Sequence, residues 1–201
     1  MHDFAGKVSA LQTALQSVPL LTQSVENIGV YRHKPPNLAG YDRRAPVDQP
    51  QNFDAVAAHR FFSADCFNKA WELIDKRKRT PEEDEQMLCL NQASLWHWSQ
   101  RADCTNANLS IGYWQAARIH TLLGRVDEAR RYGHLCLQHS PDEEPFLRAY
   151  AYEALARAES LAGDATLVAT YAAEAARLAA QVTDAEDREQ LLDDLKTVPT
   201  R

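Results

Sequence analysis

Glycine and long apolar runs are scarce in this sequence of 201 residues. It holds only 7 glycines, and no apolar run reaches the about 18 residues of a membrane-spanning helix, so we expect no membrane contact. The start, Met1–Lys7, lacks a basic region followed by an apolar core, so we expect no secretory signal. Gly-rich phosphate loops and G-x-S-x-G or H-E-x-x-H motifs are also missing, so the sequence indicates no cofactor and no metal.

Cysteine is rare and shows no pattern. The four residues, Cys66, Cys89, Cys104 and Cys136, include no C-x-x-C pair. This spacing disfavours a disulfide framework and a zinc site. We expect buried, reduced thiols in a cytoplasmic protein.

Charge is distributed unevenly along the chain. The net charge is -6, and residues 81–201 carry 11 Lys and Arg against 20 Asp and Glu. An acidic half repels phosphate backbones, which argues against nucleic acid as a partner. The one basic run, Lys76–Arg79, lies at an expected helix C-terminus, where cations complement the helix dipole.

Helix formers and apolar spacing predict an all-α protein of stacked antiparallel hairpins. Thr80-Pro81 followed by Glu83 predicts a capping box at a helix start, and Gly124 and Gly163 predict tight turns at helix ends. The expected helices cover residues 54–79, 81–101, 107–123, 126–139, 143–162, 165–181 and 184–196.

The chain divides into two regions. In residues 1–52, Phe4, Val8, Leu11 and Leu15 recur at helical spacing and predict a short amphipathic helix, while four prolines within residues 29–52 predict an extended arm. Residues 53–199 form the expected helical domain.

One helical hairpin occurs twice, with its glycines, Gly124 and Gly163, 39 residues apart. The first copy runs from Gly112 to Pro141 and resembles a tetratricopeptide repeat. The residues that carry this resemblance are Tyr113, Ala116, Ala117, Gly124, Ala129 and Pro141. Gly133 departs from the pattern, because the family places an aromatic residue there. The resemblance implies a right-handed superhelix whose inner face binds a partner.

Residues 57–199 also resemble a group of bacterial helical proteins of unassigned function. The motifs that carry this second resemblance are Phe67-Asn68-x-x-Trp71, Met87-Leu88, Ser94-x-x-His97-Trp98, Trp114-Gln115-x-x-Arg118 and Ala151-Tyr152-Glu153-Ala154. It implies a fold and no particular reaction.

In tetratricopeptide repeats, certain positions line the groove on the inner face. The resemblance implies that the corresponding residues here are Trp114, Arg118, Tyr150, Glu153 and Arg157. Such a face would combine aromatic anchors with arginines that bind a carboxylate or phosphate. The alternative is an internal ion pair between Arg118 and Glu153 that sets the register of neighbouring helices.

A second set of candidates surrounds His97. A histidine beside Trp98, with Asp75 or Glu153 to orient its ring, would provide a minimal acid–base pair. The alternative is a half-buried histidine satisfied by a neighbouring helix. For the four tryptophans, Trp71, Trp96, Trp98 and Trp114, we favour a place in the core.

Three hypotheses follow. The leading one is a module that binds a protein or peptide on its concave face. The rival is a small-molecule or catalytic pocket, built from Trp71, His97, Trp98, Trp114, Gln115 and Glu153. The third is a homodimer that exchanges residues 1–52. Replacing His97 with alanine distinguishes the first two hypotheses. The change should abolish the activity of a catalytic pocket, but it should leave the binding of a protein or peptide partner largely intact.

Overall fold

A computed structural model describes residues 53–142 and 144–199, and in these residues every regular element is an α-helix. The predicted all-α class is therefore confirmed. The seven helices are α2 (Ala55–Ile74), α3 (Pro81–Ser99), α4 (Asn106–Leu122), α5 (Val126–His139), α6 (Pro145–Ala162), α7 (Ala165–Ala179) and α8 (Ala185–Lys196). The expected N-terminal helix and arm lie outside the described residues.

Helix starts follow the local chemistry of the sequence. Thr80 and Glu83 form the predicted capping box, in which each side chain accepts from the backbone N–H of the other residue. Thr105 and Asn108 form a second box that was not predicted, because Asn replaces the usual Glu or Gln. Both boxes satisfy amide donors that a helix start otherwise leaves without partners.

The first helix ends earlier than predicted. We expected it to continue to residue 79, but α2 ends at Ile74 and Asp75 forms its C-terminal cap. Arg79 folds back and donates to the carbonyls of Leu73 and Ile74, at 3.3 and 3.4 Å. The basic run thus complements the end of a helix, as expected, but from the loop that follows it.

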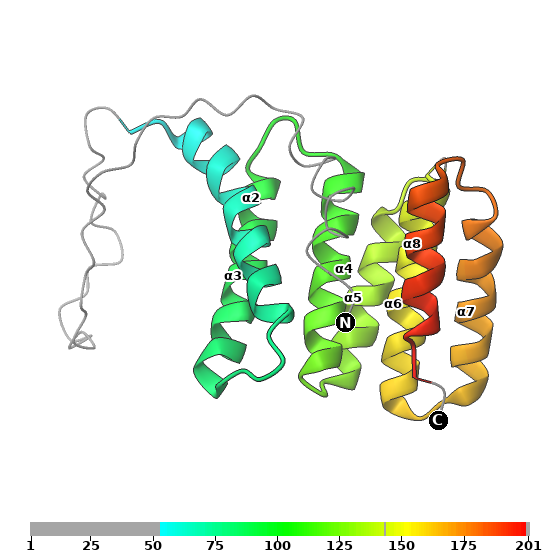
Figure 1. The fold of residues 1–201 in the computed structure, drawn as a ribbon. Coiled ribbons are helices and arrows are strands. Elements are labelled where there is room, and N and C mark those ends of the chain that lie inside the picture. The colour runs from blue at the N-terminus through cyan, green and yellow to red at the C-terminus, as the bar shows by residue number, and fades with distance from the viewer. Residues whose placement is uncertain (1–52, 143, 200–201) are drawn as a thin grey trace.

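The helices pack as three antiparallel hairpins, α2–α3, α4–α5 and α6–α7, and α8 packs against α6 and α7. Figure 1 shows the α2–α3 hairpin at one end of the row and the three helices α6, α7 and α8 together at the other. Gly124 and Gly163 adopt positive φ values of 70° and 81° at the predicted turns. The chain therefore forms a stack of helical hairpins.

The core lies between the hairpins. Trp71, Trp98 and Trp114 are buried in it, as expected, but the same expectation is wrong for Trp96, which is 56 % exposed because it points away from the packed face of α3. In the described part of the chain, no helix is both long and apolar enough to cross a membrane.

Candidate functional site

Most of the residues predicted to bind a partner lie inside the protein. Arg118 is partly exposed, but the other seven are buried. Those seven are Trp71, Trp98, Trp114, Gln115, Tyr150, Glu153 and Arg157. Their side chains contact one another and neighbouring helices.

Glu153 is the centre of a buried polar cluster on α6. Its carboxylate accepts a hydrogen bond from Trp114 Nε1, at 3.1 Å, and a very short one from Arg157 Nε. Only 1 % of Glu153 and 6 % of Arg157 is exposed. A carboxylate in such a place needs these partners, because its desolvation is otherwise uncompensated.

The same cluster fixes α8 to the stack. Arg157 Nη2 donates to the carbonyl of Asp194 at 2.9 Å and to Thr197 Oγ1 at 2.6 Å. The Tyr150 hydroxyl donates to Asp194 Oδ2 at 2.9 Å. Burial, followed by the charge of Asp194, raises the Tyr150 pKa far above its usual range, so the phenol stays protonated. The aromatic and arginine candidates of α6 thus hold the last helix.

Arg118 lies beside this cluster without joining it. Within the described residues its side chain makes no hydrogen bond or ion pair, and Glu153 pairs with Arg157 instead. Burial, followed by the charge of Arg157, lowers the pKa of Arg118, while Glu153, Asp194 and Asp75 oppose that effect. Nearby carboxylates therefore offset only part of the cost of burying the Arg118 charge.

Gln115 belongs to a second buried network that joins three helices. Its Nε2 donates to the carbonyl of Phe67 on α2 at 3.0 Å, and its Oε1 accepts from Asn91 Nδ2 on α3 at 3.1 Å. Asn91 also donates to the carbonyl of Gly112 at 3.1 Å. Sequence analysis did not identify Asn91, although an Asn on the apolar face of a helix is itself a signal of a buried polar contact.

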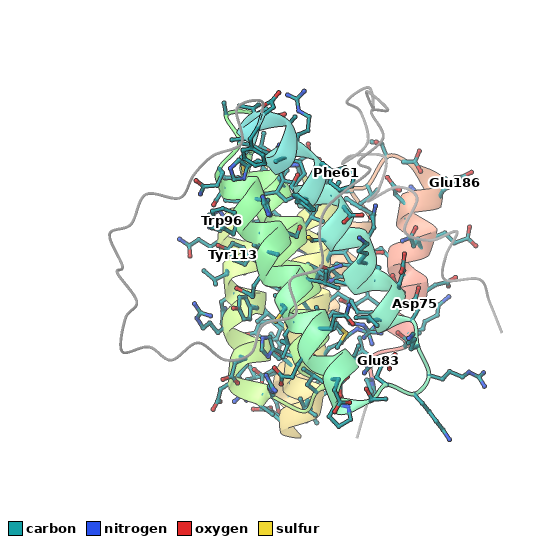
Figure 2. All side chains as sticks on the ribbon, turned by 90° about the vertical axis from the view of Figure 1, so that its left-hand side faces the viewer. Phe61, Asp75, Glu83, Trp96, Tyr113 and Glu186 are labelled. Atoms are coloured by element: carbon teal, nitrogen blue, oxygen red, sulfur yellow. The ribbon has the colours of Figure 1, made fainter. Side chains whose placement is uncertain are left out.

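His97 has a different partner from the expected carboxylate. Its Nδ1 lies 2.9 Å from Nδ1 of His59, so one imidazole donates to the other. Burial, followed by the charge of His59, lowers the His97 pKa. Asp75 lies at the far end of α2, about 24 Å along the helix axis from His59, and Figure 2 labels Asp75 and Phe61 near these two ends.

The structure does not bring His97 and Glu153 together. His97 packs in a ring cluster with His59, Phe62 and Trp96. Glu153 instead contacts Trp114 on α4 and Arg157 on its own helix, α6. Trp98, next to His97, stacks under the guanidinium of Arg101, at 3.7 Å from the ring centre. The residues of the proposed small-molecule pocket are thus divided between two parts of the fold.

A small cavity lies between α4, α5 and α6. Its volume is about 10 Å³, and its lining residues are Ser110, Ile111, Trp114, Cys136, Leu147 and Tyr150. This is about the space of one water molecule, so it does not accommodate a metabolite. Burial raises the pKa of the Cys136 thiol to about 12, so this cysteine stays protonated and unreactive at neutral pH.

The four most exposed large apolar side chains of the described residues lie on the first hairpin or just before it. We define the α2–α3 patch as the four side chains Phe53, Val56, Phe61 and Trp96, which are 52, 71, 47 and 56 % exposed. Ring contacts connect Phe61 to Phe62 at 5.1 Å, Phe62 to His97 at 5.3 Å and His97 to Trp96 at 4.7 Å. Figure 2, viewed from the α2–α3 side, labels Phe61 and Trp96. Sequence analysis did not identify this surface.

Metal-binding groups do not converge in the described residues, where no three His, Cys, Asp or Glu side chains gather as ligands. Comparison of the chain with protein-family models, with curated proteins and with solved structures finds no match.

Proposed function

We propose that this chain is a tetratricopeptide-like interaction module, a right-handed superhelix of hairpins, that binds an apolar segment of a protein or peptide partner. The observation that carries the proposal is the α2–α3 patch. Its exposed rings, Phe61 and Trp96, are connected through the half-buried rings of Phe62 and His97, and exposed aromatic side chains of this kind are typical of an interaction surface.

The two ends of the stack differ in polarity, and this difference supports the proposal. Helical-repeat proteins need a polar outer face at each end to remain soluble. At one end, α8 begins with Asp184, Glu186 and Asp187, and Figure 2 labels the outlying Glu186. At the other end, α2 and α3 leave Phe61 and Trp96 about half exposed.

The energy available at the patch is sufficient for binding. An aromatic side chain carries roughly 150–250 Å² of surface, so burying the exposed half of Phe61 or Trp96 contributes about 2–3 kcal/mol at about 25 cal/mol per Å². Two such anchors are the usual core of a peptide-binding hot spot.

The inner face offers a second, weaker contact. Arg118 is partly exposed and makes no hydrogen bond within the described residues, so a partner carboxylate would supply the hydrogen bonds that its guanidinium lacks. Trp114, Tyr150 and Arg157 support this face from inside, because they fix α4, α6 and α8 to one another.

We also assign the module to the cytoplasm. Its cysteines are unpaired: Cys66 and Cys136 are buried, Cys104 is partly buried and Cys89 is exposed. Free thiols are typical of a reducing compartment.

A peptide-display library selected against the full chain tests the proposal. Selected peptides should carry spaced apolar residues, and Trp96→Ala or Phe61→Ala should weaken their binding about tenfold or more. Leu122→Ala is the matched control, because Leu122 is also an exposed apolar residue, 40 % exposed, but on α4.

Two results would overturn the proposed surface. One is that the selected peptides bind Trp96→Ala and Phe61→Ala as tightly as the parent protein. The other is that Arg118→Gln abolishes binding while the patch variants keep it, which would assign recognition to the inner face.

A further inference from the structure

Two imidazole rings face one another across the first hairpin. Nδ1 of His59 on α2 lies 2.9 Å from Nδ1 of His97 on α3, and the ring centres are 5.0 Å apart. Both side chains are half-buried, so solvent still reaches them. Spacing in the sequence did not reveal this pair, because the two histidines are 38 residues apart on different helices. Imidazole is the commonest metal-binding side chain, so two facing ring nitrogens are a pair of candidate ligands.

The distance between the two nitrogens matches that of two neighbouring ligands on one metal ion. An imidazole nitrogen lies about 2.0–2.1 Å from a bound divalent ion such as zinc. Two nitrogens at that bond length are about 2.8–3.0 Å apart if they subtend a right angle at the ion, and about 3.3–3.4 Å apart in a tetrahedral site. The observed 2.9 Å therefore fits a square-planar ion better than a tetrahedral one.

We propose that His59 and His97 form a binding site for a divalent transition-metal ion, and that copper(II) is the ion that binds most tightly. Imidazole binds copper, nickel and zinc, and square-planar nitrogen sites are typical of copper(II) and nickel(II). Copper(II) forms the strongest complexes of the three. Water molecules complete the coordination, because among the described residues no third His, Cys, Asp or Glu side chain joins the pair.

Metal binding replaces the hydrogen bond that joins the two rings. In that bond one imidazole carries its proton on Nδ1 and donates it to Nδ1 of the other ring. When both Nδ1 atoms bind the ion, this proton moves to Nε2 of its own ring, so two neutral imidazoles keep both of their protons. The exchange needs no other reactant.

Neighbouring rings hold the two ligands in place. The ring centre of Trp96 lies 4.7 Å from that of His97 and 5.2 Å from that of His59. The ring of Phe62 packs on His97 from the other helix, at 5.3 Å. Ligands whose rotamers are fixed by packing lose little freedom when they bind an ion, so this packing favours the site.

Fluorescence of Trp96 provides a selective test, with copper(II) chloride as the probe and the full chain at slightly alkaline pH, where imidazole is neutral. Copper(II) quenches a nearby indole, and Trp96 contacts both histidine rings. The parent protein should therefore show saturable quenching. His59→Ala and His97→Ala should each weaken copper binding at least about tenfold, because even the loss of an outer partner of a metal ligand costs about 10–100-fold in affinity.

His134→Ala is the matched control, because His134 is an exposed histidine on another helix, α5. This variant should bind copper as tightly as the parent protein does. Trp96→Phe should lose most of the quenching but keep the copper affinity that calorimetry measures, which would identify Trp96 as the source of the signal.

Electron paramagnetic resonance of the copper-loaded parent protein is a second measurement that needs no variant. It should show coupling of the copper electron to nitrogens of two imidazoles. Three results would overturn the proposal: coupling to fewer than two imidazoles, unchanged copper affinity in both His59→Ala and His97→Ala, or tighter binding of zinc than of copper. Because no peptide takes part in these measurements, their outcome is independent of the proposed function.

Discussion

Glu153 carries a negative charge where water has almost no access, so its partners determine its contribution to stability. It accepts hydrogen bonds from Trp114 on α4 and Arg157 on its own helix. The resemblance to tetratricopeptide repeats grouped these three residues on one groove face, and the four-residue spacing predicted that Glu153 and Arg157 share a side of their helix. The ion pair expected between Glu153 and Arg118 does not form. The sequence did not predict burial, since that depends on how α8 covers α6.

Arg157→Met should lower the free energy of unfolding by about 3–5 kcal/mol, because it leaves Glu153 buried without its cation. Denaturation in urea measures the change. Lys69→Met is the control: it breaks an exposed pair with Asp65 on α2 and should cost less than about 0.5 kcal/mol. Adding Glu153→Gln to Arg157→Met should recover part of the loss, because the double variant buries no unpaired charge. Equal losses for Arg157→Met and Lys69→Met would contradict this account.

His120 should make stability depend on pH. It is 6 % exposed, stacks on Tyr132 at 5.1 Å, and its Nδ1 has no hydrogen-bond partner among the described residues. Burial, followed by the charge of Arg125, lowers its pKa below the ordinary 6.5. The unfolded chain therefore takes up this proton at a higher pH than the folded chain does. The stability that neutral His120 provides is complete above pH 6.5 and is lost as the pH falls through the folded pKa.

Urea denaturation of parent and His120→Phe proteins between pH 7.5 and pH 5 tests this effect. Phe keeps an aromatic ring against Tyr132 but binds no proton, so the variant should lose less stability on acidification. His97, whose pKa is also lowered, remains in both proteins and contributes equally. Parallel curves would show that His120 does not titrate as described.

At the scale of helices, local signals predicted all seven described elements and most of their ends. The Thr80 cap and the Gly163 turn each depend on residues within three positions, so sequence alone identifies them. The predicted end of α2 was five residues too late. The loop after Ile74 has no sequence periodicity that marks its start, and Arg79 in this loop donates to a carbonyl at the helix end.

Gly133 stands where the resemblance to a tetratricopeptide repeat predicts an aromatic residue. A Cβ atom at Gly133 on α5 would lie 2.8 Å from Leu155 Cδ2 on α6, so the aromatic residue of the family pattern does not fit. Gly133→Val should therefore destabilise the protein by about 1–3 kcal/mol through overpacking.

A double-mutant cycle with Leu155→Ala tests this steric explanation. Leu155→Ala alone should cost about 2–5 kcal/mol, because it leaves a cavity. The pair should cost less than the sum of the two single changes, because the side chain that Gly133→Val introduces then fills the space that Leu155 leaves. Additive losses would mean that the two residues do not compete for space.

At the scale of the whole molecule, the two ends of the stack differ. An acidic helix covers one end, and the α2–α3 patch lies at the other. The spacing of apolar residues in the sequence did not predict the patch. Trp96, His97 and Trp98 are consecutive, so in a helix each side chain points about 100° away from the one before it. One of the three must face outward, but only the packing of α2 on α3 determines that it is Trp96.

Hydrogen–deuterium exchange of the full chain, with and without a selected peptide, tests the central claim most directly. The account predicts that saturating peptide slows exchange in the first half of α2 and the last turns of α3, next to Phe61 and Trp96, and leaves α7 unchanged. Slower exchange confined to α4, α6 and α8, with α2 and α3 unaffected, would contradict it.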